Sequence, residues 1–234
     1  MSLSAILSEA FYFFRNHALQ LAALTLPLLL LQVGIQLWLG SEFAAMDPES
    51  PQIGVPHIVA TLLLFLVFSL LIASLTLFME LRTEGYQPGV FAVLQNSLPF
   101  LPWLMVAGVF SGMAIAAPVV MLSALGPLGV IGLGISLYLF ARLSYVNFMV
   151  VVERLSPLQA IKASFVFSQN ITGKTLLVLL LYFPLMLLGA MVSMTVEHAP
   201  MALRLLVESF TGFISLYVNV ALFRLYRVSR QSPQ

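Results

Sequence analysis

The chain has 234 residues, of which 61% are hydrophobic and only 8% are charged, and its formal net charge is +1. Soluble domains carry about 25% charged residues, so this chain has too few to cover a surface exposed to water. The small net charge excludes the electrostatic footprint of a nucleic-acid-binding protein. The absence of cysteine excludes disulfides and thiolate metal sites.

Six apolar stretches are long enough to cross a membrane, which takes about 20 residues in a helix. They are residues 18–40, 57–80, 100–122, 128–152, 175–196 and 205–226. The sequence therefore predicts an all-α fold, a polytopic six-helix transmembrane bundle. We expect a single integral membrane domain covering residues 1–234.

Three shorter segments precede the first, third and fifth spans. Residues 2–16 repeat apolar side chains at helical spacing. Residues 87–96 and 156–170 each carry a proline near the start, where a helix does not need its missing N–H. Because each segment is too short to cross the bilayer, we expect amphipathic helices lying in the headgroup region.

Each short segment ends with an asparagine shortly before a span, namely Asn16, Asn96 and Asn170. Asparagine accepts hydrogen bonds from free N–H groups at a helix start, so the sequence predicts three helix caps. The motif Tyr-Val-Asn also recurs in the fourth and sixth spans, at Asn147 and Asn219. We infer three repeats of an interfacial helix plus a two-span hairpin, with chance similarity among apolar sequences as the alternative. The repeat units are approximately residues 2–82, 87–154 and 156–230.

Lysine and arginine gather on one side of the predicted membrane, and only Arg204 falls on the other. The eight on the basic side are Arg15, Arg82, Arg154, Lys162, Lys174, Arg224, Arg227 and Arg230. Because cytoplasmic loops are enriched in basic residues, both termini are expected to face the cytoplasm.

Several local motifs accompany this layout. They are "FFRN" at 13–16, "PLQAIKASF" at 157–165 and "LFRLYRVSRQ" at 222–231, with the spaced set Arg142, Glu153, Ser156, Pro157, Ala160 and Ser164. The layout and motifs resemble the YciC family of bacterial inner-membrane proteins over nearly the whole chain. The spaced set also resembles the membrane domain fused to some glycerophosphodiester phosphodiesterases. The family resemblance implies a multi-pass protein of the cytoplasmic membrane of a Gram-negative bacterium, with no catalytic residues to carry over.

Arg142 lies inside the fourth predicted span, where a charge costs at least about 2.5–3.5 kcal/mol. Tyr138 and Tyr145 lie four residues before it and three after, so a helix would place them on the same face. Two interpretations follow. Arg142 binds an anionic group, such as a lipid phosphate, in a cavity between spans, or it hydrogen-bonds helix-end carbonyls and holds the bundle together.

Two further groups of residues invite a functional interpretation. Gly108 and Gly112 form a G-x-x-x-G motif in the third span, which favours close packing against the fourth span, with homodimerisation as the alternative. Glu80, Glu84 and Glu153 lie at the basic ends of the second and fourth spans. There we favour interfacial ion pairs over a paired-carboxylate site.

No nucleophile, acid–base pair or metal-ligand cluster is evident in the sequence, so we expect no enzyme activity, cofactor or metal. The favoured function is a structural or lipid-associated role in envelope homeostasis, with membrane lipids, including anionic ones, as partners. A small-molecule or lipid transporter is the alternative, and a membrane-embedded lipid enzyme is less favoured. Homo-oligomers or other inner-membrane proteins are further candidate partners.

Overall fold

The computed structural model describes residues 2–47, 52–196 and 198–231. Within these ranges all regular structure is helical, which confirms the predicted all-α fold. Six helical segments there are long and apolar enough to cross a membrane, so the chain is a multi-pass membrane protein. The α-helices are α1 (Leu3–Asn16), α2 (Ala18–Ala45), α3 (Val55–Thr83), α4 (Val90–Ser97), α5 (Leu101–Ser123), α6 (Gly129–Leu143), α7 (Val146–Val151), α8 (Pro157–Phe167), α9 (Thr172–Leu179), α10 (Tyr182–Thr195) and α11 (Met201–Gln231). Short 3₁₀ turns lie at Leu98–Phe100, Gly126–Leu128 and Ser168–Asn170.

The fourth and fifth spans each consist of two helices. α9 and α10 are separated at Leu180 and Leu181. Pro184 explains this break, because proline cannot donate a hydrogen bond to the carbonyl four residues earlier and its ring crowds that carbonyl. α6 and α7 are separated at Ser144 and Tyr145, where the sequence has no proline. That second break is stabilised by side chains of a later helix, as the candidate site shows.

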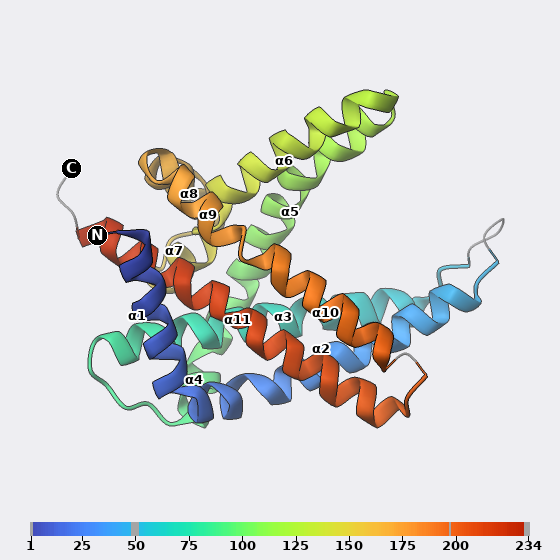
Figure 1. Cartoon of the computed structure of the whole chain (residues 1–234), viewed down its shortest axis with the longest axis horizontal. Coiled ribbons are helices and arrows are strands. Elements are labelled where there is room, and N and C mark those ends of the chain that lie inside the picture. Colours follow the sequence, from blue (N-terminus) through green and yellow to red (C-terminus); the bar gives the residue numbers. More distant parts are fainter. Residues whose placement is uncertain (1, 48–51, 197, 232–234) are drawn as a thin grey trace.

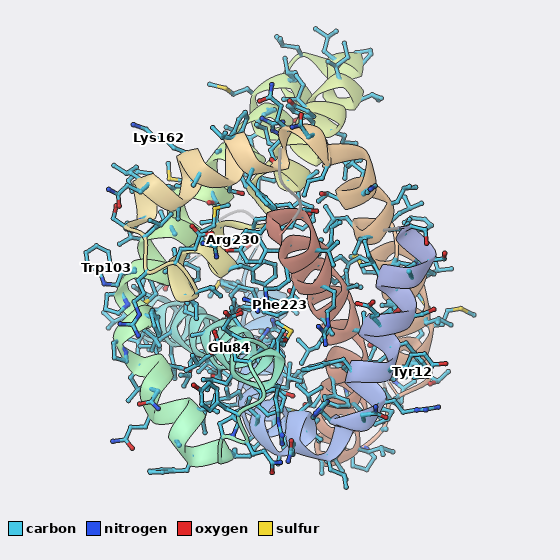
Figure 2. The ribbon with its side chains drawn as sticks, turned by 90° about the vertical axis from the view of Figure 1, so that its left-hand side faces the viewer. Tyr12, Glu84, Trp103, Lys162, Phe223 and Arg230 are labelled. Atoms are coloured by element: carbon cyan, nitrogen blue, oxygen red, sulfur yellow. The ribbon has the colours of Figure 1, made fainter. Side chains whose placement is uncertain are left out.

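The short helices and the hairpins pack in a ring. Each short helix contacts the second span of the preceding hairpin: α4 contacts α3, α8 contacts α7, and α1 contacts α11. The first span of each hairpin also contacts the second span of the preceding hairpin: α5 contacts α3, α9 contacts α6, and α2 contacts α11. The last hairpin therefore closes onto the first helices of the chain. Figure 2 looks at the end where the short helices lie, with Tyr12, Trp103 and Lys162 at its rim.

An aromatic core joins α7, α8 and α11, where the second and third hairpins meet. The ring centroid of Tyr226 lies 5.6 Å from that of Phe148 and 5.3 Å from that of Phe167. Tyr145 and Phe223 are also buried, and Phe223 lies near the middle of the end shown in Figure 2. Because lipid tails are as apolar as the side chains, close packing of this kind is what favours association of the spans.

Beyond this core the hairpins diverge. In Figure 1 the α5–α6 hairpin points away from α2–α3 and α10–α11. Burial follows the same division: the buried residues of α5 are Leu101, Leu104 and Ala107, all in its first half, and none of α10 is buried. The far halves of the hairpins therefore present their apolar side chains to lipid.

The glycines of the third and fourth spans have three different surroundings. A Cβ atom at Gly132 of α6 would lie 2.5 Å from the carbonyl oxygen of Pro118, so this glycine is where α5 and α6 pack closely. A Cβ atom at Gly108 would instead meet the ring of Phe65 in α3 at 2.9 Å, and one at Gly112 would have nothing within 4 Å. The expectation that Gly108 and Gly112 pack the third span against the fourth is thus corrected. The added Cβ atoms of these two glycines point toward α3 and into open space, whereas that of Gly132 meets the α5 backbone.

The three predicted asparagine caps are also corrected. Asn16 is the last residue of α1, Asn96 lies within α4, and Asn170 ends a 3₁₀ turn. The N-cap residues of the helices that follow are His17, Phe100 and Ile171, and none of them makes a side-chain cap bond. The short helices run almost directly into the spans. At each junction a backbone N–H, that of His17, Leu101 or Ile171, donates to a carbonyl of the preceding turn.

Candidate functional site

Arg142 is held by protein groups. It lies near the end of α6, is only 6% exposed, and donates a hydrogen bond to the backbone carbonyl of Phe165 in α8. Its guanidinium lies 4.4 Å from the ring centroid of Phe165 and 5.7 Å from that of Tyr138. The carbonyl belongs to the last turn of α8, where helical carbonyls lack intrahelical donors. The geometry therefore matches the second interpretation, in which Arg142 bonds a helix end and holds the bundle together.

The backbone carbonyl of Arg142 completes the same junction. It accepts hydrogen bonds from Ser164 Oγ at 2.7 Å and Ser168 Oγ at 3.2 Å, and both serines are buried. α8 begins at a capping box on Ser156, and Ala160 packs with its side chain fully buried. The spaced serines and alanine of the sequence pattern thus dock α8 onto the broken fourth span.

The two tyrosines expected beside Arg142 have different contacts. Tyr138 contacts the guanidinium, whereas Tyr145 points into the aromatic core, with its hydroxyl 2.6 Å from Thr175 Oγ1 of α9. Because α6 ends at Leu143, Tyr145 does not continue its helical register. The predicted grouping of Tyr145 with Arg142 is therefore corrected.

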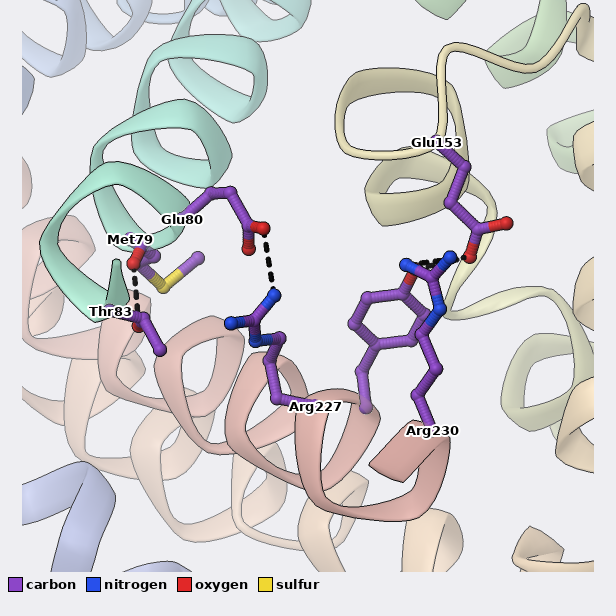
Figure 3. A network of polar contacts seen from close by, with 7 residues as sticks. Met79, Glu80, Thr83, Glu153, Arg227 and Arg230 are labelled. Carbon is purple, nitrogen blue, oxygen red and sulfur yellow. Dashed lines mark hydrogen bonds and ion pairs between the residues drawn. The ribbon is translucent and has the colours of Figure 1, made fainter. Parts of the chain in front are cut away.

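Ion pairs join the ends of the second, fourth and sixth spans (Figure 3). Arg227 Nη1 lies 2.8 Å from Glu80 Oε1, and Arg230 Nη1 lies 3.4 Å from Glu153 Oε1. The hydroxyl of Tyr226 also donates to Glu153. The favoured ion pairs are present for Glu80 and Glu153, but both partners come from α11. Each of these carboxylates is thus paired with an arginine, and Glu153 also with a tyrosine hydroxyl, which is typical of residues that hold helices together.

A cavity of about 1020 Å³ lies beside this network, at the ends of α3, α4, α7 and α8. Its apolar lining residues are Leu77, Leu81, Pro99, Phe100, Trp103, Val150 and Leu155. Its polar lining residues are Gln95, Asn96, Arg154, Ser156 and Gln159. The cavity thus combines one cation and several amides with a surface suited to hydrocarbon.

Arg154 is distinguished by its backbone as well as its position. Its φ is +54°, and within the described ranges it is the one non-glycine residue with a positive φ. That left-handed conformation costs roughly 1–2 kcal/mol in an ordinary residue. Its side chain is exposed and joins none of the ion pairs found in the described part of the chain. Since Glu153 is engaged by Tyr226 and Arg230, the guanidinium of Arg154 remains available to a ligand.

The sequence analysis considered Arg142, and not Arg154, as a candidate ligand for an anionic group. Arg154 was counted only as a topology signal, although it directly follows Glu153 at the end of a span. Asn96, expected as a cap, lines the cavity together with Gln95. The combination of a span-end arginine, amides and the nearby Trp103 was the available signal, but the sequence alone does not bring residues 95–103 next to residue 154.

No family model, no curated protein and no solved structure matches this chain. Among the described residues, no three histidine, aspartate or glutamate side chains are placed to hold a metal ion.

Proposed function

We propose that the protein binds an anionic phospholipid in the inner membrane of a bacterium, with the phosphate at Arg154. The observation that carries this proposal is the cavity of about 1020 Å³ beside Arg154, at the upper end of the range for ligand sites. A guanidinium recognises phosphate oxygens through paired hydrogen bonds, and the amides of Asn96 and Gln159 offer further donors. The apolar lining residues, Trp103 among them, suit the glycerol esters and the first part of the acyl chains. Tryptophan is enriched at headgroup level.

In this proposal both termini face the cytoplasm, so the cavity opens at the cytoplasmic leaflet. The basic residues at the span ends support that orientation. The short helices support a position at the membrane surface. Each helix has residues buried against the protein and also an exposed apolar side chain. These side chains are Phe11, Phe91 and Val166, which are 52%, 79% and 71% exposed. The resemblance to the YciC family supports the same location. The role is lipid association in envelope homeostasis, with no catalytic step assigned.

Arg154→Gln is expected to lower the affinity for phosphatidylglycerol about tenfold or more, because a hydrogen bond to a charged group contributes about 1.5–3 kcal/mol. Native mass spectrometry during a titration with phosphatidylglycerol measures the bound fraction. Lys162→Gln is the matched control, since Lys162 is an exposed cation of α8 outside the cavity lining. Inorganic phosphate as a competitor distinguishes recognition of the headgroup alone from recognition of the whole lipid.

Retention of phosphatidylglycerol by Arg154→Gln at the wild-type level would refute the proposed site. An equal loss in both variants would also refute it, because general attraction of a basic surface would then account for binding.

A further inference from the structure

A second cavity, of about 320 Å³, lies where the three hairpins meet. Its lining comes from α3, α5, α6, α7, α10 and α11, and is mostly apolar. Six polar side chains also face it: Ser69, Ser111, Ser144, Asn147, Tyr182 and Asn219. No charged side chain is found among the described lining residues. Polar groups at membrane depth are costly unless they are satisfied, so their convergence on one cavity requires an explanation.

The polar groups divide into satisfied and unsatisfied ones. Ser69 donates to a carbonyl of its own helix at 2.8 Å, and Ser144, in the break after α6, donates to the carbonyl of Phe140 at 2.6 Å. Asn219 Nδ2 donates to the hydroxyl of Tyr182 at 3.0 Å, which leaves the phenolic proton of Tyr182 to another acceptor. Ser111 Oγ is buried and has no hydrogen-bond partner in the described part of the chain. The cavity therefore offers hydrogen-bond donors and acceptors to a guest.

The two helix breaks place some of these groups. Tyr182 is the first residue of α10, directly after the break that Pro184 explains. Asn147 is the second residue of α7, directly after the break that follows α6. The interruptions of the fourth and fifth spans thus bring Asn147 and Tyr182 to the cavity.

A guest can reach this cavity from the bilayer. The lining residues Phe68 and Phe140 are 43% and 37% exposed, so the cavity is continuous with the outer surface. The α5–α6 hairpin diverges from the other two hairpins on the side of the tips (Figure 1). Apolar walls and access at membrane depth favour a lipid. The uncharged lining favours a neutral lipid, because an ion in this site would have no opposite charge to pair with.

We propose that the central cavity binds a neutral lipid that carries a free hydroxyl group, such as a diacylglycerol. A hydroxyl both donates and accepts, as do the amide of Asn147 and the hydroxyl of Ser111. A lipid with only ester carbonyls would use the donors and leave the acceptors unpaired. The central cavity and the cavity beside Arg154 share no lining residue, so this proposal does not depend on the proposed anionic-lipid site.

Gly112→Leu tests the site by filling it. A Cβ atom at Gly112 has nothing within 4 Å, and the residue lines the cavity, so a leucine extends into the space that the lipid would occupy. Gly134→Leu is the matched control, because its Cβ also meets nothing within 4 Å and Gly134 is not in the lining. The probe is a diacylglycerol with a photoactivatable diazirine in one acyl chain, added to liposomes that hold the full chain.

The wild type and Gly134→Leu are expected to give cross-linked peptides from α5, α10 and α11, and Gly112→Leu to lose most of that signal. Asn147→Leu, which removes one hydrogen bond, should lower the labelling about two- to tenfold. Competition with a triacylglycerol, which lacks the free hydroxyl, should have little effect. Thermal melts of each variant show whether it is folded.

Equal labelling of folded Gly112→Leu and wild type would overturn the proposal, as would labelling confined to the outer surfaces of the hairpins. Equal competition by the triacylglycerol would show that the hydroxyl is not recognised. A cavity holding water alone would give no specific cross-link in any variant.

Discussion

Arg142→Ala is expected to lower the free energy of unfolding by about 2–4 kcal/mol. The substitution removes a charge-assisted hydrogen bond to the carbonyl of Phe165, worth about 1.5–3 kcal/mol, and a desolvated cation–π contact of up to about 2 kcal/mol. Within the described part of the chain, the Phe165 carbonyl would then keep only the 3.4 Å hydrogen bond from Ser168 Oγ. Unfolding in a denaturing detergent, followed by circular dichroism, gives the difference in free energy, and native mass spectrometry gives phosphatidylglycerol retention for the same samples.

Arg15→Ala is a suitable control, because Arg15 is an exposed cation whose guanidinium lies over Phe11 and Tyr12. Its removal should change stability far less. If Arg142→Ala kept its stability and lost bound phosphatidylglycerol, Arg142 would be the lipid ligand and the assignment to Arg154 would fail. Loss of stability with lipid retained per folded molecule is the expected pattern.

Gly132→Ala should destabilise the α5–α6 hairpin by about 1–3 kcal/mol, the usual cost of an overpacked site. The added methyl would lie 2.5 Å from the carbonyl oxygen of Pro118 and 3.1 Å from the Cα of Val119, so two helix backbones must separate. Gly134→Ala meets nothing within 4 Å and should be neutral or slightly stabilising, since alanine favours helix more than glycine does. A disulfide-trapping series between α5 and α6, run on both variants, would report the change in spacing.

Equal stability of the two glycine variants would mean that the hairpin tolerates the added volume by a small rigid shift. The close contact at Pro118 would then not be what holds α5 to α6. Gly108→Ala is a useful intermediate case, because the nearest atom there is the far end of the Phe65 side chain, which can move.

The spans could be predicted because apolar length alone defines a membrane helix, and this signal does not depend on what packs against what. The surroundings of Arg142 could not be predicted from the sequence. Its position in a span indicated that its guanidinium needs a hydrogen-bond partner. That partner, the carbonyl of Phe165, lies 23 residues later in another helix. Whether Arg142 binds a ligand or a protein carbonyl depends on tertiary packing, which a local sequence pattern does not indicate.

The asparagines illustrate the same limit. The alignment of Asn16, Asn96 and Asn170 captured a real recurrence of position, just ahead of each odd-numbered span. The capping role inferred from it assumed that each span starts from a free helix end. Because the preceding short helix supplies the carbonyls instead, the residue type was no guide to its contacts. Asn147 and Asn219, noted only as a recurring motif, both line the central cavity.

The ring of contacts among the three units bears on how the chain is made. α1 and α2 leave the ribosome before α11, the helix on which both of them pack. Until α11 is made, the face of α1 that carries Phe14 lacks its native neighbours, Phe213 and Tyr217. The middle units acquire their partners in order, since α4 and α5 find α3 already inserted. A nascent chain stalled before α11 would therefore lack the contacts that join the third hairpin to α1 and α2.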